Sequence, residues 1–350
     1  MLQSERLQTF VALGDFIRSV DAQPELTEIA QQAYYKNNWF TPDNSLKAMR
    51  AIADEFLSVD KLMAWVSQYS TESVTPRTVG VVMAGNIPAV SFHDLLCVVL
   101  SGHNLLAKLS SQDFVLIHYL IQKLKEINPG FETLIEEAER LNAADAYIAT
   151  GSTNTARYFD YYFAKKPHII RKNRTSVGIL MGEEGEEEFL KLGHDVSDYY
   201  GLGCRNVSTI LVPETYDFVP MLRALEPNVK TYLNNHKYQN NYDYNKSIYL
   251  INAVSHYDNG YLLLTEDEGL VSPISVLYYQ PYRTQADAES WLADRADRIQ
   301  VVTSAQASPN PTSANRGWFP GSIPFGQTQH PQLNDYADGV DTMAFLSNEL

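Results

Sequence analysis

Between residues 78 and 162 the chain alternates short apolar runs with longer helical patterns, and this alternation constrains the fold more than any other feature. The expected strands are Val79–Met83, Leu105–Leu109 and Asp145–Ala149. Each is followed by a short loop and then by apolar residues at helical spacing. Strands that alternate with helices over such distances form a mostly parallel sheet with right-handed crossovers. The sequence therefore predicts an α/β protein.

Small and polar residues stand at the carboxyl ends of these strands. Asn86 follows the first strand, Lys108 lies at the end of the second, and Gly151 and Ser152 follow the third. Because ligands of parallel sheets bind beyond the carboxyl ends of the strands, these residues are candidates for a binding site. By its position alone, Lys108 is better explained as a solvated cation at a strand end.

The rest of the chain is expected to contain further helices and a second group of strands. Residues 1–75 carry apolar positions at helical spacing, with a helix start at Thr41 and Pro42. The later strands are expected at Asn206–Val212, Ser247–Val254, Tyr261–Leu264, Val276–Tyr279 and Ile299–Thr303. The tyrosine-rich stretch Tyr232–Tyr249 is either a substrate-facing surface or a connection, and the second interpretation is preferred. These patterns divide the chain into four expected parts, residues 1–75, 76–200, 201–320 and 321–350.

Composition limits the classes of function. The 350 residues have a formal net charge of -15, which argues against a general affinity for nucleic acid or an anionic membrane. Two cysteines argue against a disulfide framework, and the lack of an apolar run near 18 residues argues against a membrane span. The amino terminus does not resemble a secretory signal. We expect a reduced, cytoplasmic protein.

The loop from Asp198 to Ser208 contains one of the two cysteines, Cys204. A helical pattern precedes it and a strand pattern follows it, and Gly201 and Gly203 allow another backbone or a substrate to approach the sulfur. Cys204 is either a nucleophile or a small buried residue, and for a free cysteine the second is more common. Cys97 lies in an apolar run and is expected to be buried.

A basic segment, Lys165–Arg174, stands out in this acidic chain. Two interpretations are open for it. The segment either holds the phosphates of a nucleotide or of coenzyme A, or forms an ordinary solvated face, which is the more frequent role of a charge run.

Five short motifs together resemble the aldehyde dehydrogenase superfamily. In chain order they are Gly85–Pro88, Lys108–Ser110, Thr150–Ser152, the Cys204 loop and Ile323–Gly326. Each motif is weak alone, and the ordered set is much more specific. Three longer stretches look like its acyl-CoA reductase branch, the LuxC-type fatty acyl reductases; they are Asn37–Thr41, Gly201–Ser208 and Phe325–Gln329. The likeness runs from about residue 35 to the carboxyl end.

This resemblance implies an aldehyde dehydrogenase-like fold. It implies a nucleotide-binding α/β domain at 76–200, a catalytic α/β domain at 201–320 with the cysteine at the interface, and a small carboxyl-terminal oligomerisation element, and thus a homo-oligomer. Cys204 would become acylated during the reaction. Asn86 would donate its side-chain amide to the oxyanion, with the backbone N–H of Cys204 as second donor.

The resemblance also implies a nicotinamide cofactor, NADPH or alternatively NADH. Lys108 and Ser110 would contact the ribose hydroxyls or the 2′-phosphate, and Gly151 and Ser152 would lie against the pyrophosphate or nicotinamide. Glu268 would correspond to the glutamate that contacts the nicotinamide ribose in many relatives, although its spacing to the following proline does not match.

One departure from the family pattern concerns the direction of the reaction. Oxidising aldehyde dehydrogenases carry a glutamate that activates water to hydrolyse the thioester, and the corresponding region here, Ile170–Ser176, has no carboxylate. Without that general base, the acyl group would leave by exchange with another thiol. The prediction is therefore NAD(P)H-dependent reduction of an acyl thioester, of coenzyme A or of an acyl-protein, to an aldehyde, with coenzyme A as the leaving group.

Two other functions remain open. A semialdehyde or acyl-phosphate reductase would share the thioester chemistry and release phosphate instead of a thiol. A non-catalytic nucleotide-binding subunit would keep the fold without turnover. A dedicated acyl-transfer partner protein is compatible with each catalytic alternative.

Overall fold

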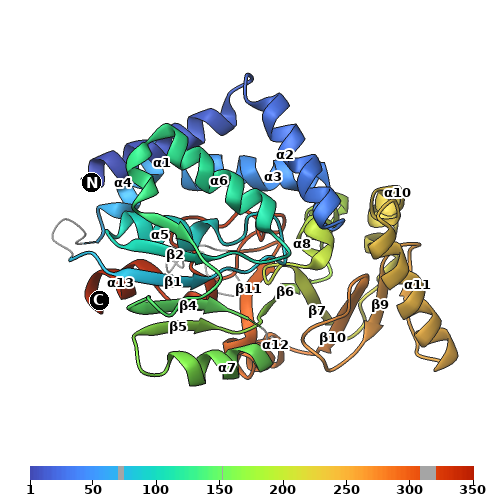
Figure 1. Cartoon of the computed structure of the whole chain (residues 1–350). Helices are drawn as coiled ribbons and strands as arrows, with labels where there is room; N and C mark the ends of the chain where they lie inside the picture. The colour runs from blue at the N-terminus through green and yellow to red at the C-terminus, as the bar shows by residue number, and fades with distance from the viewer. Residues whose placement is uncertain (70–74, 152, 308–320) are drawn as a thin grey trace. The chain divides into compact units, whose positions relative to one another are not determined.

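The chain forms two compact units, each built around its own sheet (Figure 1). The computed structural model describes residues 1–69, 75–151, 153–307 and 321–350. The first unit comprises Met1–Asn173 and Pro331–Leu350, and the second comprises Arg174–His330. The carboxyl-terminal segment thus returns to the first unit.

The sheet of the first unit is parallel throughout, as the sequence predicts. Its strands are β1 (Thr78–Val82), β2 (Asn104–Lys108), β3 (Ile135–Glu137), β4 (Ala146–Thr150) and β5 (His168–Arg171), in the order β3-β2-β1-β4-β5. Val82 at the end of β1 lies opposite Lys108 of β2 on one side and Ala149 of β4 on the other. The strand order reverses between β1 and β4, which is where ligands bind in such sheets.

Most helices of the first unit come from the amino-terminal part of the chain. They are α1 (Gln3–Arg18), α2 (Gln23–Lys36), α3 (Pro42–Ala51), the π-helix η1 (Ile52–Phe56), α4 (Val59–Val66), α5 (Phe92–Leu100), α6 (Phe114–Ile127), the 3-10 helix η2 (Pro129–Glu132), α7 (Thr153–Phe163), the 3-10 helix η6 (Ala337–Gly339) and α13 (Thr342–Asn348). The predicted helix start is confirmed, because the Thr41 hydroxyl accepts from the Asn44 N–H and Pro42 is the first helical residue.

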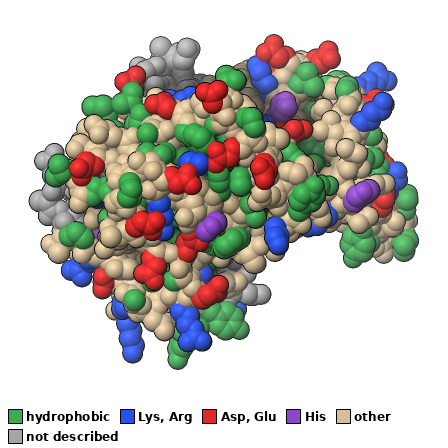
Figure 2. All heavy atoms as spheres, turned by 45° about the horizontal axis from the view of Figure 1, so that its top comes forward, with side chains coloured by type: hydrophobic (Ala, Val, Ile, Leu, Met, Phe, Trp, Pro, Cys, Tyr) green, Lys and Arg blue, Asp and Glu red, His purple; other side chains and the backbone are tan. Residues whose placement is uncertain are grey.

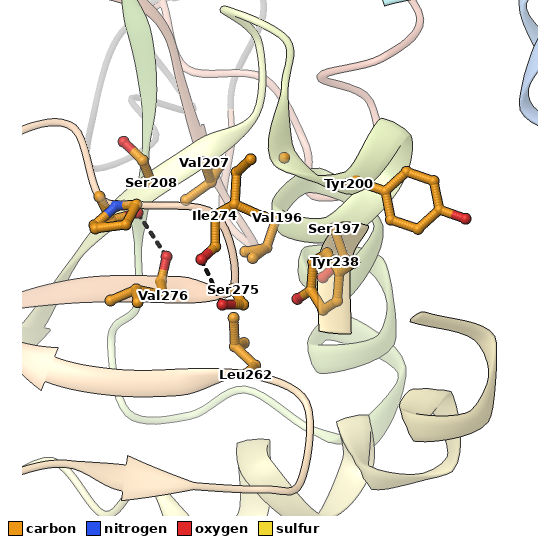
Figure 3. A pocket seen from close by; sticks show the side chains of 13 residues that line it. Val196, Ser197, Tyr200, Val207, Ser208, Tyr238, Leu262, Ile274, Ser275 and Val276 are labelled. Atoms are coloured by element: carbon orange, nitrogen blue, oxygen red, sulfur yellow. Dashed lines mark hydrogen bonds between the residues drawn. The ribbon is translucent and has the colours of Figure 1, made fainter. Parts of the chain in front are cut away.

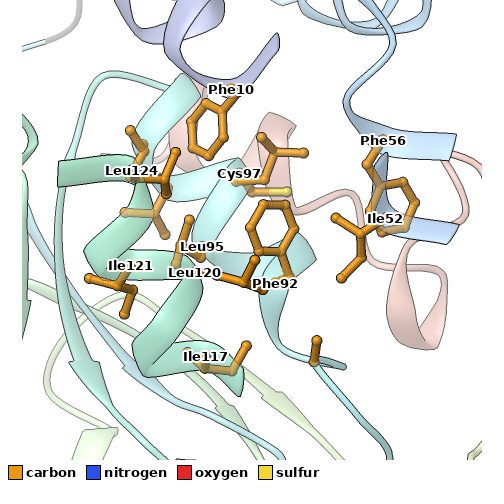
Figure 4. Close-up of a cluster of buried hydrophobic side chains, with 14 of the residues drawn as sticks. Phe10, Ile52, Phe56, Phe92, Leu95, Cys97, Ile117, Leu120, Ile121 and Leu124 are labelled. Atoms are coloured by element: carbon orange, nitrogen blue, oxygen red, sulfur yellow. The ribbon is translucent and has the colours of Figure 1, made fainter. Parts of the chain in front are cut away.

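The core of the first unit is centred on α5, which is apolar on nearly every side. Phe92 and Cys97 of this helix are completely buried among Phe10 of α1 and the leucines of α6 (Figure 4). Burial raises the pKa of the Cys97 thiol well above its ordinary value. Cys97 is therefore a core residue, as its sequence context predicts.

The second unit has a mixed sheet. Its strands are β6 (Thr175–Ile179), β7 (Val207–Pro213), β8 (Tyr257–Asp258), β9 (Leu263–Glu266), β10 (Val276–Tyr282) and β11 (Ile299–Ser304), in the order β11-β6-β7-β10-β9-β8. Only the β8–β9 pair, among the described strands of this sheet, is antiparallel. The helices are α8 (Glu186–Ser197), η3 (Asp198–Gly201), α9 (Val219–Leu225), η4 (Glu226–Asn228), α10 (Val229–Leu233), α11 (His236–Ile251), α12 (Gln285–Ala293) and η5 (Ala296–Arg298).

Two expectations for residues 232–254 are wrong. The stretch Tyr232–Tyr249 is no simple connection, and Ser247–Val254 is no strand, because α11 occupies most of this region. The Asn235 side chain begins this helix by accepting from the N–H groups of Lys237 and Tyr238. Tyr238 and Tyr242 are then buried one turn apart, a helical spacing that the density of polar residues conceals.

The division into units also differs from the expected four parts. β6 pairs with β7 and β11, so the second unit begins at residue 174 instead of 201. The expected tail, residues 321–350, is divided between the units. Its last part belongs to the first unit, where Met343, Phe345 and Leu346 are buried and α13 packs on α5. These apolar residues contribute to the core of the first unit, and the oligomerisation role expected for the tail stays a prediction.

No helix within the described residues combines the length and the apolar character that crossing a membrane requires.

Two histidines, the buried His103 and the partly buried His93, attach the carboxyl-terminal segment to the first unit and make its stability depend on pH. His93 binds the Leu333 carbonyl, and His103 accepts from the Arg77 N–H and binds the Leu346 carbonyl. Burial lowers both histidine pKa values. The unfolded chain then binds more protons below about pH 6.5, so the free energy of unfolding should fall as the pH drops through this range, by at most about 1.4 kcal/mol per histidine and pH unit.

The measurement is chemical unfolding between about pH 7.5 and 5.5 for the unaltered protein and His103→Gln. Glutamine keeps one donor and one acceptor but does not titrate. The variant should lose less stability on acidification, whereas an identical pH slope for both proteins would contradict the prediction. The comparison with the variant is essential because Asp113, whose pKa is raised by burial, acts in the opposite direction.

Candidate functional site

Cys204 lies in the loop that joins η3 to β7, the helix-to-strand junction that the sequence predicts. The residue is partly exposed, in contrast to Cys97. The Cys204 carbonyl accepts a hydrogen bond of 3.1 Å from the Ser176 hydroxyl of β6, which ties the loop to the sheet. A partly exposed thiol on a backbone held in this way is suited to act as a nucleophile.

The Asn206 side chain organises this loop, and the sequence analysis did not single it out. Asn206 is 2% exposed. Its Nδ2 donates to the carbonyls of Asp195, Val196 and Asp198 at 3.1, 3.3 and 2.9 Å, and its Oδ1 accepts from the Gly203 N–H at 2.8 Å. This one side chain thus provides hydrogen-bond partners both for carbonyl groups at the carboxyl end of α8 and for the N–H of the residue before Cys204. The only sequence feature that points to this role is the position of Asn206, two residues after Cys204.

The backbone before Cys204 is strained. Tyr199 and Tyr200 adopt φ values of 52° and 60°, and Gly201 adopts 73°. Only the glycine takes this left-handed conformation freely, and each non-glycine residue in it costs on the order of 1–3 kcal/mol. Both tyrosine rings are buried, and burial raises the pKa of Tyr199. The packed rings and the Asn206 bonds stabilise a conformation that the chain would not adopt alone.

The motif at Ile323–Gly326 lies alongside the cysteine loop. The Asp195 carboxylate of α8 accepts from the Gly326 N–H at 2.7 Å and from the N–H and hydroxyl of Thr328 at 3.1 and 2.8 Å. Arg205, next to the cysteine, donates from Nε to the Thr328 carbonyl. Burial raises the pKa of Asp195, and the bonds from Gly326 and Thr328 oppose this shift. Two motifs more than 120 positions apart therefore form one hydrogen-bonded frame.

A small pocket adjoins this frame in the second unit (Figure 3). It has a volume of about 30 Å³ and is lined by the end of α8, the start of β7 and residues 272–276. Ser272 and Ser275 at its wall donate to the carbonyls of Val276 and Ile274. The space suits about two water molecules and is too small for an acyl chain as it stands.

Glu268 lies on the exposed turn between β9 and β10 of the same unit. This turn is attached to β7, because the hydroxyls of Ser208 and Thr209 donate to the Leu270 carbonyl at 2.7 and 2.9 Å. The turn is therefore linked to the strand that follows the cysteine loop. The proposed contact of Glu268 with a cofactor stays a prediction.

The candidate residues of the first unit gather where the sequence analysis placed them, at the carboxyl edge of its sheet. Asn86 and Lys108 are exposed there, and Ser110 and Gly151 are half-buried. Asn86 and Gly151 follow β1 and β4, the strands between which the order reverses. Ser152 lies outside the described residues.

The donor groups at this edge fit a dinucleotide. Lys108 offers a cation to a phosphate, Asn86 and Ser110 offer hydrogen-bond donors, and α7 begins directly after the loop that contains Gly151. The amino-terminal N–H groups of a helix favour an anionic ligand. Gly85 makes the edge compact, since a Cβ atom at this position would lie 2.5 Å from the Ser110 hydroxyl oxygen.

Three cations of the basic segment Lys165–Arg174 are bound within the chain. Arg171 is 4% exposed and binds both oxygens of Asp94 at 2.8 and 2.7 Å, with Thr342 as a further partner. Lys166 donates to the Ala144 carbonyl, and Arg174 to the Ile299 carbonyl. The charge of Arg171 is neutralised inside the first unit, so it does not serve a ligand.

Comparisons with known proteins identify the fold. No protein-family model matches the chain, and a search of curated proteins found no match. Solved structures do match. The chain has an aldehyde dehydrogenase-like fold. Neighbours include aldehyde dehydrogenases from Bacillus cereus and Mycobacterium tuberculosis, both solved with NAD+, and KauB from Pseudomonas aeruginosa.

The similarity extends over most of each chain. The Bacillus, Mycobacterium and Pseudomonas structures have TM-scores of 0.59, 0.60 and 0.61 with sequence identities of 15, 16 and 13%. The alignments cover 87% of this chain and 72, 73 and 72% of the three neighbours. At these identities the comparison establishes the fold, and the chemistry must be argued from this chain's own residues.

Proposed function

We propose that the protein reduces an acyl-CoA thioester, with a fatty acyl group, to an aldehyde with NADPH or NADH, as the LuxC-type reductases do. The observation that carries the proposal is the partly exposed Cys204 on a strained, hydrogen-bonded loop at the start of β7 in an aldehyde dehydrogenase-like fold. The reductive direction is supported by residues 170–176, which contain no carboxylate to activate water.

In the first step of the proposed reaction, the Cys204 thiolate attacks the acyl carbon of the thioester. The new sulfur–carbon bond gives a tetrahedral oxyanion, which the Asn86 side-chain amide and the Cys204 N–H stabilise. The oxyanion collapses with loss of coenzyme A as a thiolate, which takes up a proton from solvent. Cys204 is left carrying the acyl group as a thioester.

In the second step the acyl group is released as an aldehyde. A bound reduced nicotinamide supplies the hydride for this step. The same two donors hold the oxyanion of the thiohemiacetal on Cys204, and its collapse frees the aldehyde and restores the Cys204 thiolate. Lys108 and Ser110 would hold the ribose hydroxyls or 2′-phosphate, Gly151 and Ser152 would face the pyrophosphate, and Glu268 would contact the nicotinamide ribose.

The test is a panel of acyl-CoA esters of increasing chain length with NADPH or NADH, in which nucleotide oxidation and release of free thiol are followed in parallel. Equal amounts of both products would establish the reaction and show the preferred chain length. Turnover of an acyl phosphate with phosphate release, and none with acyl-CoA, would select the acyl-phosphate reductase. Thiol release without nucleotide oxidation would indicate that hydride transfer needs an acyl-transfer partner. Nucleotide binding without either product would replace the proposal by a non-catalytic role.

Replacement of Lys108 by alanine is expected to weaken nucleotide binding. The side chain is exposed at the carboxyl edge of β2, so its removal should cost little stability. Loss of one charge-assisted contact of about 1.5–3 kcal/mol should raise the Kd of NADPH by about tenfold or more. Fluorescence titration with NADPH and NADH measures this, and Lys165→Ala is the control, because Lys165 is exposed and precedes β5 at the opposite edge of the sheet. An unchanged Kd in Lys108→Ala would remove this residue from the site.

A further inference from the structure

Asp113 stands at a junction between two of the loops that carry candidate residues of the first unit, the loops with Asn86 and Ser110. It follows the Ser110 loop of β2 and immediately precedes α6. Its carboxyl group does not cap that helix. Instead, Oδ2 accepts a hydrogen bond of 2.7 Å from the N–H of Ala89, in the loop after β1.

The Ala89 backbone requires this support. Its φ of 54° lies in the left-handed region, where a residue with a side chain is strained. Ala89 is three positions after Asn86. The same loop touches the Ser110 loop at Gly85, where a Cβ atom would meet Ser110 Oγ at 2.5 Å and the Asp113 nitrogen at 3.0 Å. The path of the backbone around Asn86 therefore depends on its contacts with the segment that ends at Asp113.

The carboxyl group is held in an unusual environment. Asp113 is 2% exposed, and its buried Oδ1 has no hydrogen-bond partner among the described residues. Burial raises the pKa of Asp113 well above its ordinary value, and the bond from Ala89 opposes the shift. Ordinary core packing would be served better by an apolar residue, because a buried polar atom without a partner costs about 1–3 kcal/mol. Core packing therefore does not explain why position 113 carries a carboxyl group.

We propose that Asp113 is a positioning residue: by holding the Ala89 N–H it maintains the turn that directs the Asn86 amide toward the oxyanion. The inference rests on the proposed function of Asn86. It places the effect of Asp113 on the chemical step, not on nucleotide affinity. Asparagine should replace Asp113 well, because its carbonyl oxygen accepts from Ala89, whereas leucine of similar size has no acceptor.

The experiment is a double-mutant cycle on the full chain. The proteins are the unaltered enzyme, Asp113→Asn, Asp113→Leu, Asn86→Ala and the double variant Asp113→Leu with Asn86→Ala. We expect Asp113→Leu to lower kcat about 10- to 100-fold with the KM for nucleotide changed less than about threefold, and Asp113→Asn to keep most of the activity. In the Asn86→Ala background the leucine substitution should have almost no further effect on kcat.

Other results would overturn the inference. Equal kcat losses from Asp113→Leu with and without Asn86 would show a general structural role, as would an Asp113→Asn variant as impaired as Asp113→Leu. If Asp113→Leu does not fold, judged by nucleotide binding, Asp113→Ala takes its place in the cycle. Normal turnover in all Asp113 variants refutes the inference alone. Absence of turnover in the unaltered protein refutes the proposed function and this inference together.

Discussion

Cys204→Ala is expected to abolish acyl-CoA reduction, with a loss in kcat of about 10⁴-fold or more. The substitution removes the atom that forms the acyl intermediate, and only noncovalent binding then remains. Nucleotide binding should be unchanged, because the described candidate nucleotide residues at the sheet edge, Lys108, Ser110 and Gly151, belong to the first unit. The measurements are single-turnover formation of aldehyde and mass spectrometry of the acylated protein after addition of acyl-CoA alone.

Cys97→Ala is the matched control, because Cys97 is the other cysteine of the chain. It is buried in the α5 core, so its replacement should lower stability modestly and leave the acylation of the protein intact. Acylation that persists in Cys204→Ala, or that disappears in Cys97→Ala while the protein stays folded, would contradict the assignment of Cys204 as the nucleophile.

Asn206→Ala is expected to have the largest effect on the loop itself. The substitution leaves the Gly203 N–H and the carbonyls at the end of α8 without their partner. Because Asn206 is only 2% exposed, water does not readily replace the lost bonds. Each of the four abandoned groups costs about 1–3 kcal/mol, so a total loss of at least about 4 kcal/mol in unfolding free energy is expected. The rate of Cys204 acylation should fall at least about tenfold, because the strained turn before the cysteine loses its support.

Asn245→Ala provides the comparison for this effect. Asn245 is also buried in the second unit, and its Nδ2 donates to the Ile274 carbonyl at 2.9 Å. Its loss should cost about 1 kcal/mol and leave the acylation rate nearly unchanged. Denaturant unfolding measures the stability, and mass spectrometry of the acylated protein at successive times after addition of acyl-CoA measures the acylation rate. If Asn206→Ala and Asn245→Ala slow acylation equally, Asn206 has no special role in presenting the cysteine.

Some residues of the candidate site could be predicted from the sequence, and others could not. Asn86, Lys108, Ser110 and Gly151 stand together at the carboxyl edge of the first sheet, as the sequence pattern indicates. The prediction of their position is confirmed because a strand, its end and the following loop are local features of the sequence. The sequence pattern does not indicate Asn206, Asp195 or Asp113 as parts of the site. Their importance depends on which backbone groups they bind and on their burial, and neither quantity is visible in a run of residues.

The basic segment Lys165–Arg174 also shows that the role of a residue can depend on its partners in the folded chain. Its residue types are compatible with phosphate binding, yet Arg171 is paired with Asp94, 77 positions earlier. A buried guanidinium bound to both oxygens of a carboxylate is not available to a ligand. Such pairing is a property of the folded chain, and the charge pattern alone does not reveal it.

The amino-acid sequence by itself determined the alternation of strands and helices in the first unit, the burial of Cys97 and the position of Cys204 between a helix and a strand. These features follow from hydrophobic periodicity and turn residues over a few positions. Only the tertiary structure decided where the second unit begins, because the pairing of β6 with β7 joins segments separated by all of α8. It also decided that Tyr238 and Tyr242 face a core from a helix and that Asn206 holds the strained loop. Burial and nonlocal hydrogen bonds set these outcomes, and both arise only when distant segments pack together.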